Sequence, residues 1–131
     1  METSVEMAQE QKNDVFLNNI YLIKTNTPLP DTVPEDEKSR LFEMASKVLL
    51  KEDGCLYYEI QSRNCTKQLM LIPDTLKSLV FEAYHSSQLS GGHMSWRKTL
   101  AKIMRKYYWP SIYADIRQWC TQCMACQLRR Q

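Results

Sequence analysis

A chain of 131 residues can form one ordinary domain or two small ones, but it is too short for a large catalytic core with accessory modules. Its composition, 44% hydrophobic and 24% charged, excludes a wholly disordered protein. No apolar run approaches the roughly 18 residues of a membrane span, so no membrane partner is expected. The net charge of +2 conceals an asymmetry, because residues 1–74 carry 8 Lys and Arg against 13 Asp and Glu, whereas residues 75–131 carry 9 against 2.

The acidic half begins with two predicted helices. Residues 5–24 are loosely periodic in apolar side chains and are expected to form one helix, which a Pro-rich linker or turn follows. A second helix is expected over residues 33–49. Thr32 and Glu35 have the spacing of a capping box, and apolar residues recur after them at helical intervals.

Two β-rich runs follow a break at Asp53-Gly54. Residues 56–61 and 68–72 are rich in β-branched, aromatic and other apolar side chains, and a short polar segment separates them. The sequence therefore predicts a β-hairpin.

The basic half predicts three more helices. Pro73-Asp74 can open the first, which ends at His85 and is followed by a loop with two of the three glycines of the chain. The apolar stripe of this helix is expected to consist of Leu76, Leu79, Val80, Ala83 and Tyr84.

The next helix is expected to carry an apolar face and a basic face. Ser95 can cap it, and apolar residues from Trp96 to Tyr107 lie within about 100° of arc. The opposite face gathers the basic side chains of Lys98, Lys102, Arg105 and Lys106. Pro110 then starts the last helix, whose apolar side is expected to include Ile112, Tyr113, Ile116, Trp119 and Cys120.

Four residues of the basic half have the spacing of a zinc site, namely His85, His93, Cys123 and Cys126. A Cys-x2-Cys knuckle brings two thiolates to one metal ion, and two imidazoles across a short loop can complete a tetrahedron at about 2.0–2.3 Å. These are the only histidines in the chain. Because all four ligands come from the protein, the sequence predicts one closed, structural zinc ion per chain and no catalytic residue.

The remaining cysteines allow other assignments. The N-terminus lacks the features of a secretory signal, so we expect an intracellular, reducing compartment in which cysteines are thiols or metal ligands. Cys120 and Cys123 form an overlapping Cys-x2-Cys, but Cys120 is expected on the buried side of its helix, so Cys123 and Cys126 are favoured. A redox Cys-x2-Cys would require a βαβ context, and here the cysteines follow a helix. Cys55 and Cys65 have no partner at metal spacing and are expected to be packing residues.

These elements predict a mainly α fold with a small β-hairpin, in the α+β class. Residues 1–31 are expected to form an N-terminal helix and linker, and residues 32–72 an extension with a helix and the β-hairpin. Residues 73–131 are expected to form a zinc-stabilised helical bundle with two histidine and two cysteine ligands.

The same sequence resembles the N-terminal region of gypsy-type LTR retrotransposon integrases, which contains an HHCC zinc-binding domain related to that of retroviral integrases. The resemblance covers nearly the whole chain and is most specific over residues 85–127. It is carried there by His85, Gly92-His93, Lys98-Thr99, Ile103, Tyr107-Tyr108-Trp109-Pro110, Asp115-Ile116 and Cys123-Met124-Ala125-Cys126-Gln127. Ser95 stands where the family usually has glycine, and a serine can cap the helix.

The resemblance implies a region that precedes an RNase H-like catalytic core, which these residues do not include. The fragment itself is therefore expected not to be an enzyme, whereas its parent would be a DNA strand transferase within a retrotransposon polyprotein. A short natural protein derived from such an element is the other possibility. The implied partners are DNA at the ends of the element and other integrase subunits, and the implied location during integration is the nucleus. No small-molecule substrate is expected.

The basic face leaves two functions open. Lys98, Lys102, Arg105 and Lys106 can contact DNA phosphates, or the basic half can simply dock on the acidic half. The alternative function is a domesticated zinc module that acts as a protein-assembly scaffold without binding DNA. A zinc hydrolase is disfavoured because the site has no open position. A sequence-specific helix-turn-helix is disfavoured because the basic residues do not lie on the second, recognition helix.

Overall fold

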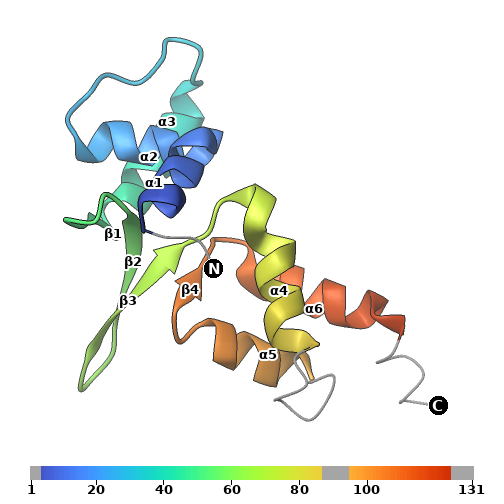
Figure 1. Cartoon of the computed structure of the whole chain (residues 1–131). Coiled ribbons are helices and arrows are strands. Elements are labelled where there is room, and N and C mark those ends of the chain that lie inside the picture. Colours follow the sequence, from blue (N-terminus) through green and yellow to red (C-terminus); the bar gives the residue numbers. More distant parts are fainter. Residues whose placement is uncertain (1–3, 87–94, 125–131) are drawn as a thin grey trace. The chain divides into compact units, whose positions relative to one another are not determined.

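The computed structural model describes residues 4–86 and 95–124, and the chain divides into two compact units, Met1–Pro73 and Asp74–Gln131 (Figure 1). The first unit contains α1 (Ser4–Asn13), α2 (Val15–Lys24), α3 (Glu35–Ala45), β1 (Val48–Leu50), β2 (Leu56–Gln61) and β3 (Thr66–Leu71). The second contains a short 3-10 helix, η1 (Asp74–Leu76), followed by α4 (Lys77–His85), α5 (Trp96–Ile103), β4 (Tyr107–Tyr108) and α6 (Ile112–Gln122). The predicted α+β class is confirmed.

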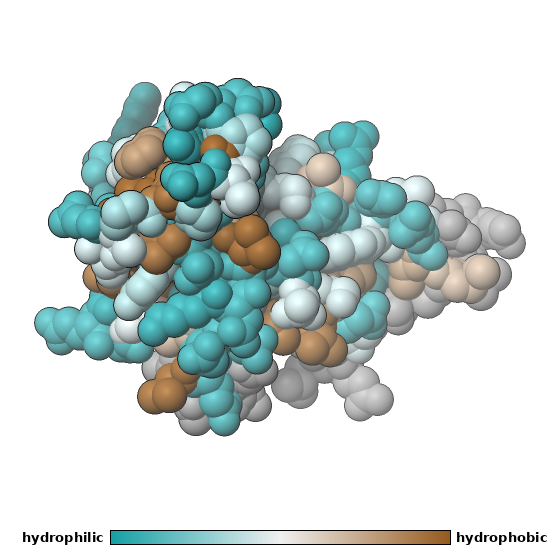
Figure 2. Space-filling view, turned by 90° about the horizontal axis from the view of Figure 1, so that it is seen from above, coloured by the Kyte–Doolittle hydropathy of each residue, from teal (hydrophilic) through white to brown (hydrophobic). Residues whose placement is uncertain are grey.

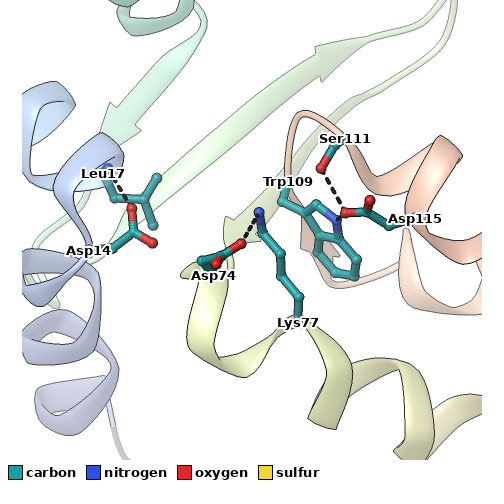
Figure 3. Close-up of polar contacts among 7 residues, drawn as sticks. All are labelled: Asp14, Leu17, Asp74, Lys77, Trp109, Ser111 and Asp115. Atoms are coloured by element: carbon teal, nitrogen blue, oxygen red, sulfur yellow. Dashed lines mark hydrogen bonds and ion pairs between the residues drawn. The ribbon is translucent and has the colours of Figure 1, made fainter. Parts of the chain in front are cut away.

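The single helix predicted over residues 5–24 is two helices in the structure, because Asp14 caps a new one. The Asp14 backbone is extended, with φ −87° and ψ 125°, and its carboxylate accepts a hydrogen bond from the Leu17 N–H at 3.0 Å (Figure 3). The first N–H groups of a helix have no partner within it, and the Asp14 carboxylate satisfies one of them. This favours the start of a new helix at Val15 over continuation of α1. α2 then packs against both α1 and α3.

The helix predicted over residues 33–49 is wrong at both ends. α3 follows Pro34, which makes no side-chain cap, so the predicted capping box does not form. It ends at Ala45, and Val48 and Leu49 belong to β1 instead of the helical stripe. A short apolar run fits either structure, and here pairing with β2 satisfies the backbone and buries Val48.

The predicted β-hairpin is confirmed and belongs to a larger antiparallel sheet. β2 pairs with β3, with Tyr57 opposite Met70, and β1 pairs with β2, with Leu49 opposite Tyr57. The turn between β1 and β2 contains Gly54 at φ +82°, a left-handed conformation that residues with a Cβ rarely adopt. The predicted helix break is therefore a turn between strands.

Gln11 joins α1 to the end of this sheet. Its side chain is 2% exposed, and its amide nitrogen donates to the carbonyls of Leu56 at 3.1 Å and Leu71 at 2.7 Å. Its amide oxygen accepts from the Leu56 N–H at 2.8 Å. The buried apolar residues of the first unit include Leu17, Ile20, Leu41, Ala45, Val48, Leu56, Leu69 and Leu71.

We expect Gln11→Leu to destabilise the first unit by about 2 kcal/mol, because an unsatisfied buried backbone group costs about 1–3 kcal/mol. Hydrogen exchange of the β2 and β3 amides measures this loss without a contribution from the second unit. Gln9 is an exposed residue of the same helix, and Gln9→Leu is the matched control with an expected change within about 0.5 kcal/mol. Equal effects of the two substitutions would show that the Gln11 bonds contribute nothing.

α4 ends at His85, as predicted, but its buried side differs from the predicted stripe. Phe81 and His85 are the buried residues, whereas Leu79 is 63% exposed and Ala83 is also exposed. Phe81 and His85 are four residues apart and therefore share one face of the helix. The prediction followed a run of mostly aliphatic residues, whereas the buried face consists of an aromatic ring and an imidazole.

α5 is capped by Ser95, as predicted, with its hydroxyl accepting from the Lys98 N–H at 3.4 Å. The helix ends at Ile103 and does not continue to Tyr107, so the predicted boundary is wrong. Met104 is the C-cap, and the next two N–H groups donate to carbonyls three residues back instead of four. The aromatic residues that follow have high β propensity and are extended.

The first turn of α6 is fixed by Asp115. Its Oδ2 accepts from the Trp109 indole N–H at 2.9 Å and from the Ser111 hydroxyl at 2.7 Å (Figure 3). Tyr113, predicted on the apolar side, is 56% exposed. The buried residues of α6 otherwise follow the predicted stripe and are Ile112, Ile116 and Cys120.

Among the described helices, none is long and apolar enough to cross a membrane. On the face shown in Figure 2, hydrophobic residues form separate groups among hydrophilic ones. Isolated hydrophobic residues at the surface are normal for a folded chain and do not by themselves mark a docking site. The large exposed hydrophobic residues are Val5, Val15, Phe42, Leu79, Tyr113 and Met124.

Candidate metal centre

His85 has a fixed orientation in the core of the second unit. It is the last residue of α4, it is fully buried, and its ring stacks on Phe81 with centroids 4.8 Å apart and an angle of 17° between the planes. Phe81 in turn contacts the Trp119 ring of α6 at 5.3 Å. This packing fixes the plane of the imidazole.

The hydroxyl of Thr99, on α5, determines which ring nitrogen of His85 carries the hydrogen. Thr99 Oγ1 lies 3.3 Å from His85 Nδ1, and it donates its own hydrogen to the Ser95 carbonyl at 3.0 Å. A hydroxyl has one hydrogen to donate, so toward His85 its oxygen is the acceptor and Nδ1 is protonated. In a neutral imidazole this leaves a lone pair on Nε2, which is the form that binds a metal ion.

Cys120 lies on the same side of the imidazole as Thr99. Its sulfur is 3.7 Å from His85 Nδ1, and its side chain is buried on α6, where the apolar stripe places it. The two ring nitrogens point in different directions, so a metal ion on Nε2 is away from a sulfur beside Nδ1. The arrangement favours Cys120 as a packing neighbour of His85 and leaves the metal-binding nitrogen to other ligands.

Cys123 occupies the C-cap of α6. Its backbone leaves the helix in an extended conformation, with φ −69° and ψ 118°, and its N–H donates to the Cys120 carbonyl at 3.3 Å. The side chain is half-buried and borders a cavity of about 460 Å³. Phe81, whose ring stacks on His85, lines the same cavity. The cavity is lined by Ser78, Phe81, Glu82, Trp119, Gln122, Cys123 and Met124.

His93 and Cys126, the other two predicted ligands, lie outside the described residues. Over residues 4–86 and 95–124, no group of three or more His, Cys, Asp or Glu side chains could hold a metal ion. The structure therefore describes two of the four predicted ligands, each at the C-terminal end of a helix. The donor set of a neutral imidazole and a half-buried thiol fits zinc.

The predicted basic face does not exist as one helical surface, because α5 ends before two of its members. Lys98 is exposed on the first turn of α5, and Lys102 is half-buried on its last turn. Arg105 and Lys106 are exposed but belong to the turn that leads into β4. Three exposed cations remain, distributed over a helix and a turn.

Sequence reasoning missed the roles of Thr99 and Phe81 beside His85. Thr99 is fully buried and lies four residues before the buried Ile103, a spacing that puts both on one face of α5. Phe81 lies four residues before His85. Because four residues separate positions on one face of a helix, the spacing from His85 could have indicated Phe81.

The two cysteines of the first unit differ from each other. Cys55 is fully buried, as expected of a packing residue, whereas Cys65 is exposed and the same expectation for it is wrong. Burial, with a smaller contribution from the Asp53 carboxylate, raises the pKa of the Cys55 thiol to about 11. Both the burial of Cys55 and the raised pKa of its thiol favour a packing role.

Residues 72–131 match the protein family described as Integrase zinc binding domain. The match covers the whole second unit, in which a buried histidine ends one helix and a cysteine caps another. Over 95% of its length the chain is also similar to proteins named Gypsy retrotransposon integrase-like protein 1. It is 31% identical to the one from Macaca fascicularis and 29% identical to those from Homo sapiens and Mus musculus. The chain spans 23%, 23% and 24% of these three relatives, about a quarter of their length.

Proposed function

We propose that the second unit binds one structural zinc ion through His85, His93, Cys123 and Cys126. The observation that carries this proposal is the buried His85, whose Nδ1 faces the Thr99 oxygen and whose Nε2 keeps its lone pair. For His93 and Cys126 the support is their spacing and their place within the matched family. Bound zinc supplies a crosslink between the ends of two helices.

A site with two imidazoles and two thiolates has no open coordination position, so its role is structural and not hydrolytic. The α4–α6 helices are short and enclose a small core, which makes them dependent on such a crosslink. Metal binding to a site of this kind is coupled to folding. The zinc ion therefore stabilises the unit, and the surface of that unit carries the function.

We infer that this surface contacts DNA at the ends of the element and other integrase subunits. The second half of the chain carries 9 Lys and Arg against 2 Asp and Glu, and two thiolates offset the charge of the zinc ion, so the surplus remains. Lys98, Arg105 and Lys106 present part of it to solvent. The inferred location is the nucleus during integration, and neither a membrane nor a small molecule is among the inferred partners.

Binding to a short labelled DNA duplex at several salt concentrations tests the DNA contact. If Arg105 and Lys106 each neutralise a phosphate, replacing both by glutamine flattens the slope of log affinity against log salt by about 1.8. The matched control replaces Arg63 and Lys67 by glutamine, since both are exposed cations of the first unit. A wild-type chain that binds no duplex at low salt would refute the DNA role.

We also propose that this chain by itself neither cuts nor joins DNA, because its zinc is closed to substrate and the implied carboxylate triad is not among its residues. Incubation of the purified chain with labelled DNA and Mg²⁺ or Mn²⁺ is expected to give no nicked or joined product. Metal-dependent nicking or joining activity that co-purifies with the chain through several columns would instead place an active site within these residues.

A further inference from the structure

Two arginines from different helices lie over one tryptophan in the second unit. The guanidinium carbon of Arg97, on α5, is 5.1 Å from the centre of the Trp96 ring, and that of Arg117, on α6, is 5.4 Å from it. The edge of Tyr113 completes the cluster, with ring centroids 5.2 Å apart at 73°. Both arginines and Tyr113 are exposed, and Trp96 is half-exposed.

The charge of these arginines is not neutralised within the described part of the chain. The acidic side chains of the unit have partners elsewhere, since Asp115 accepts from Trp109 and Ser111. Asp74 pairs with Lys77, and Glu82 accepts from Ser86. No side-chain hydrogen bond or ion pair among the described residues holds the guanidinium of Arg97 or Arg117. Two full positive charges therefore face solvent, and each guanidinium carbon lies within 5.4 Å of the centre of the same ring.

Contact with Trp96 prepares these side chains to bind an anion. A guanidinium over an aromatic ring keeps its N–H groups available, and a side chain already ordered loses less entropy when it binds. Phosphate oxygens accept hydrogen bonds from such N–H groups, so the chemistry of the cluster fits phosphate groups.

We propose that Arg97 and Arg117, held by Trp96, form a clamp for the phosphodiester backbone of DNA. This inference rests on the proposed DNA-binding function and assigns it a surface at the α5–α6 contact, separate from Arg105 and Lys106. The clamp binds with little preference for base sequence, because phosphate contacts carry no sequence information.

The test measures affinity for a short labelled duplex between about 50 and 200 mM salt. The variant Arg97→Gln with Arg117→Gln is expected to flatten the slope of log affinity against log salt by about 1.8. The variant Arg97→Lys with Arg117→Lys keeps both charges and loses the two-pronged guanidinium contact with phosphate, so it is expected to keep the slope and bind several-fold more weakly. Arg40→Gln with Arg63→Gln is the matched control, because both arginines are exposed in the first unit.

Zinc content and circular dichroism are measured for every variant, so that a lost fold is not read as a lost contact. A glutamine variant that is folded, holds zinc and keeps the wild-type slope would overturn the clamp while leaving the DNA role intact. If the wild-type chain binds no duplex, the DNA role fails and the clamp fails with it. An equal loss in the Arg40 and Arg63 control would assign the effect to general charge and would also overturn the clamp.

Discussion

The Cys123→Ser protein is expected to hold no zinc and to lose the helical packing of its second unit. Cys123 is the described cysteine of the proposed knuckle, and structural zinc contributes about 10–16 kcal/mol in comparable small sites. This exceeds the stability of a small domain, so the loss of a ligand unfolds the unit. Zinc analysis of the purified protein and hydrogen exchange over α4, α5 and α6 measure the two effects. Because the chain forms two compact units, the β2 and β3 amides are expected to stay protected.

Cys120→Ser is the control that separates a ligand from a packing residue. Cys120 is buried beside His85 Nδ1, so serine there is expected to keep one zinc per chain with a modest loss of stability. If instead Cys120→Ser removes the zinc and Cys126→Ser retains it, the metal site is the upstream knuckle, Cys120 and Cys123. That result would overturn the ligand assignment.

Thr99→Val is expected to raise the zinc dissociation constant by about 10–100-fold, the usual range for losing a hydrogen bond to a metal-binding histidine. Valine matches the shape of threonine and removes the acceptor that holds Nδ1–H. Without it, the imidazole is free to carry its hydrogen on Nε2, where the metal must bind. Competition with a chelator of known affinity measures the change.

A merely structural role for Thr99 is separated from the positioning role by two further measurements. Thr99→Ser restores the hydroxyl and is expected to restore most of the zinc affinity. In the zinc-bound protein, the Nδ1–H of His85 is expected to exchange slowly with solvent in the wild type and faster in Thr99→Val, because the wild type holds it in a hydrogen bond. Unchanged exchange and unchanged affinity in folded Thr99→Val would remove Thr99 as the residue that positions His85.

The elements of the fold were predictable where a local signal determined them, and not where two signals competed. The β2–β3 hairpin and the Ser95 cap followed from residue type and spacing alone. The split at Asp14 and the strand at Val48 did not, because both lie inside apolar periodicity that fits a helix. The Asp14 cap separates α1 from α2. Pairing with β2 makes Val48 part of a strand, and this pairing is a contact between segments that a local pattern does not show.

Spacing in the sequence indicated candidate ligands, but it did not indicate the groups that orient His85. Spacing alone indicated His85 and Cys123, which the structure places at the C-terminal ends of α4 and α6. The hydrogen bond from His85 to Thr99 joins residues 14 positions apart on separate helices, so no local pattern could reveal it. The predicted end of α5 was also wrong. The apolar stripe continues in the sequence to Tyr107, but the helix ends at Ile103 and the backbone turns at Met104.

The most direct test of the zinc assignment is X-ray absorption at the zinc edge of the purified chain, together with its zinc content. The account predicts one zinc per chain, with two sulfur ligands at about 2.3 Å and two nitrogen ligands at about 2.0–2.1 Å. A spectrum with three sulfur ligands would bring Cys120 into the site. A chain that folds without zinc, or a zinc ion with a water ligand, would contradict the closed structural site itself.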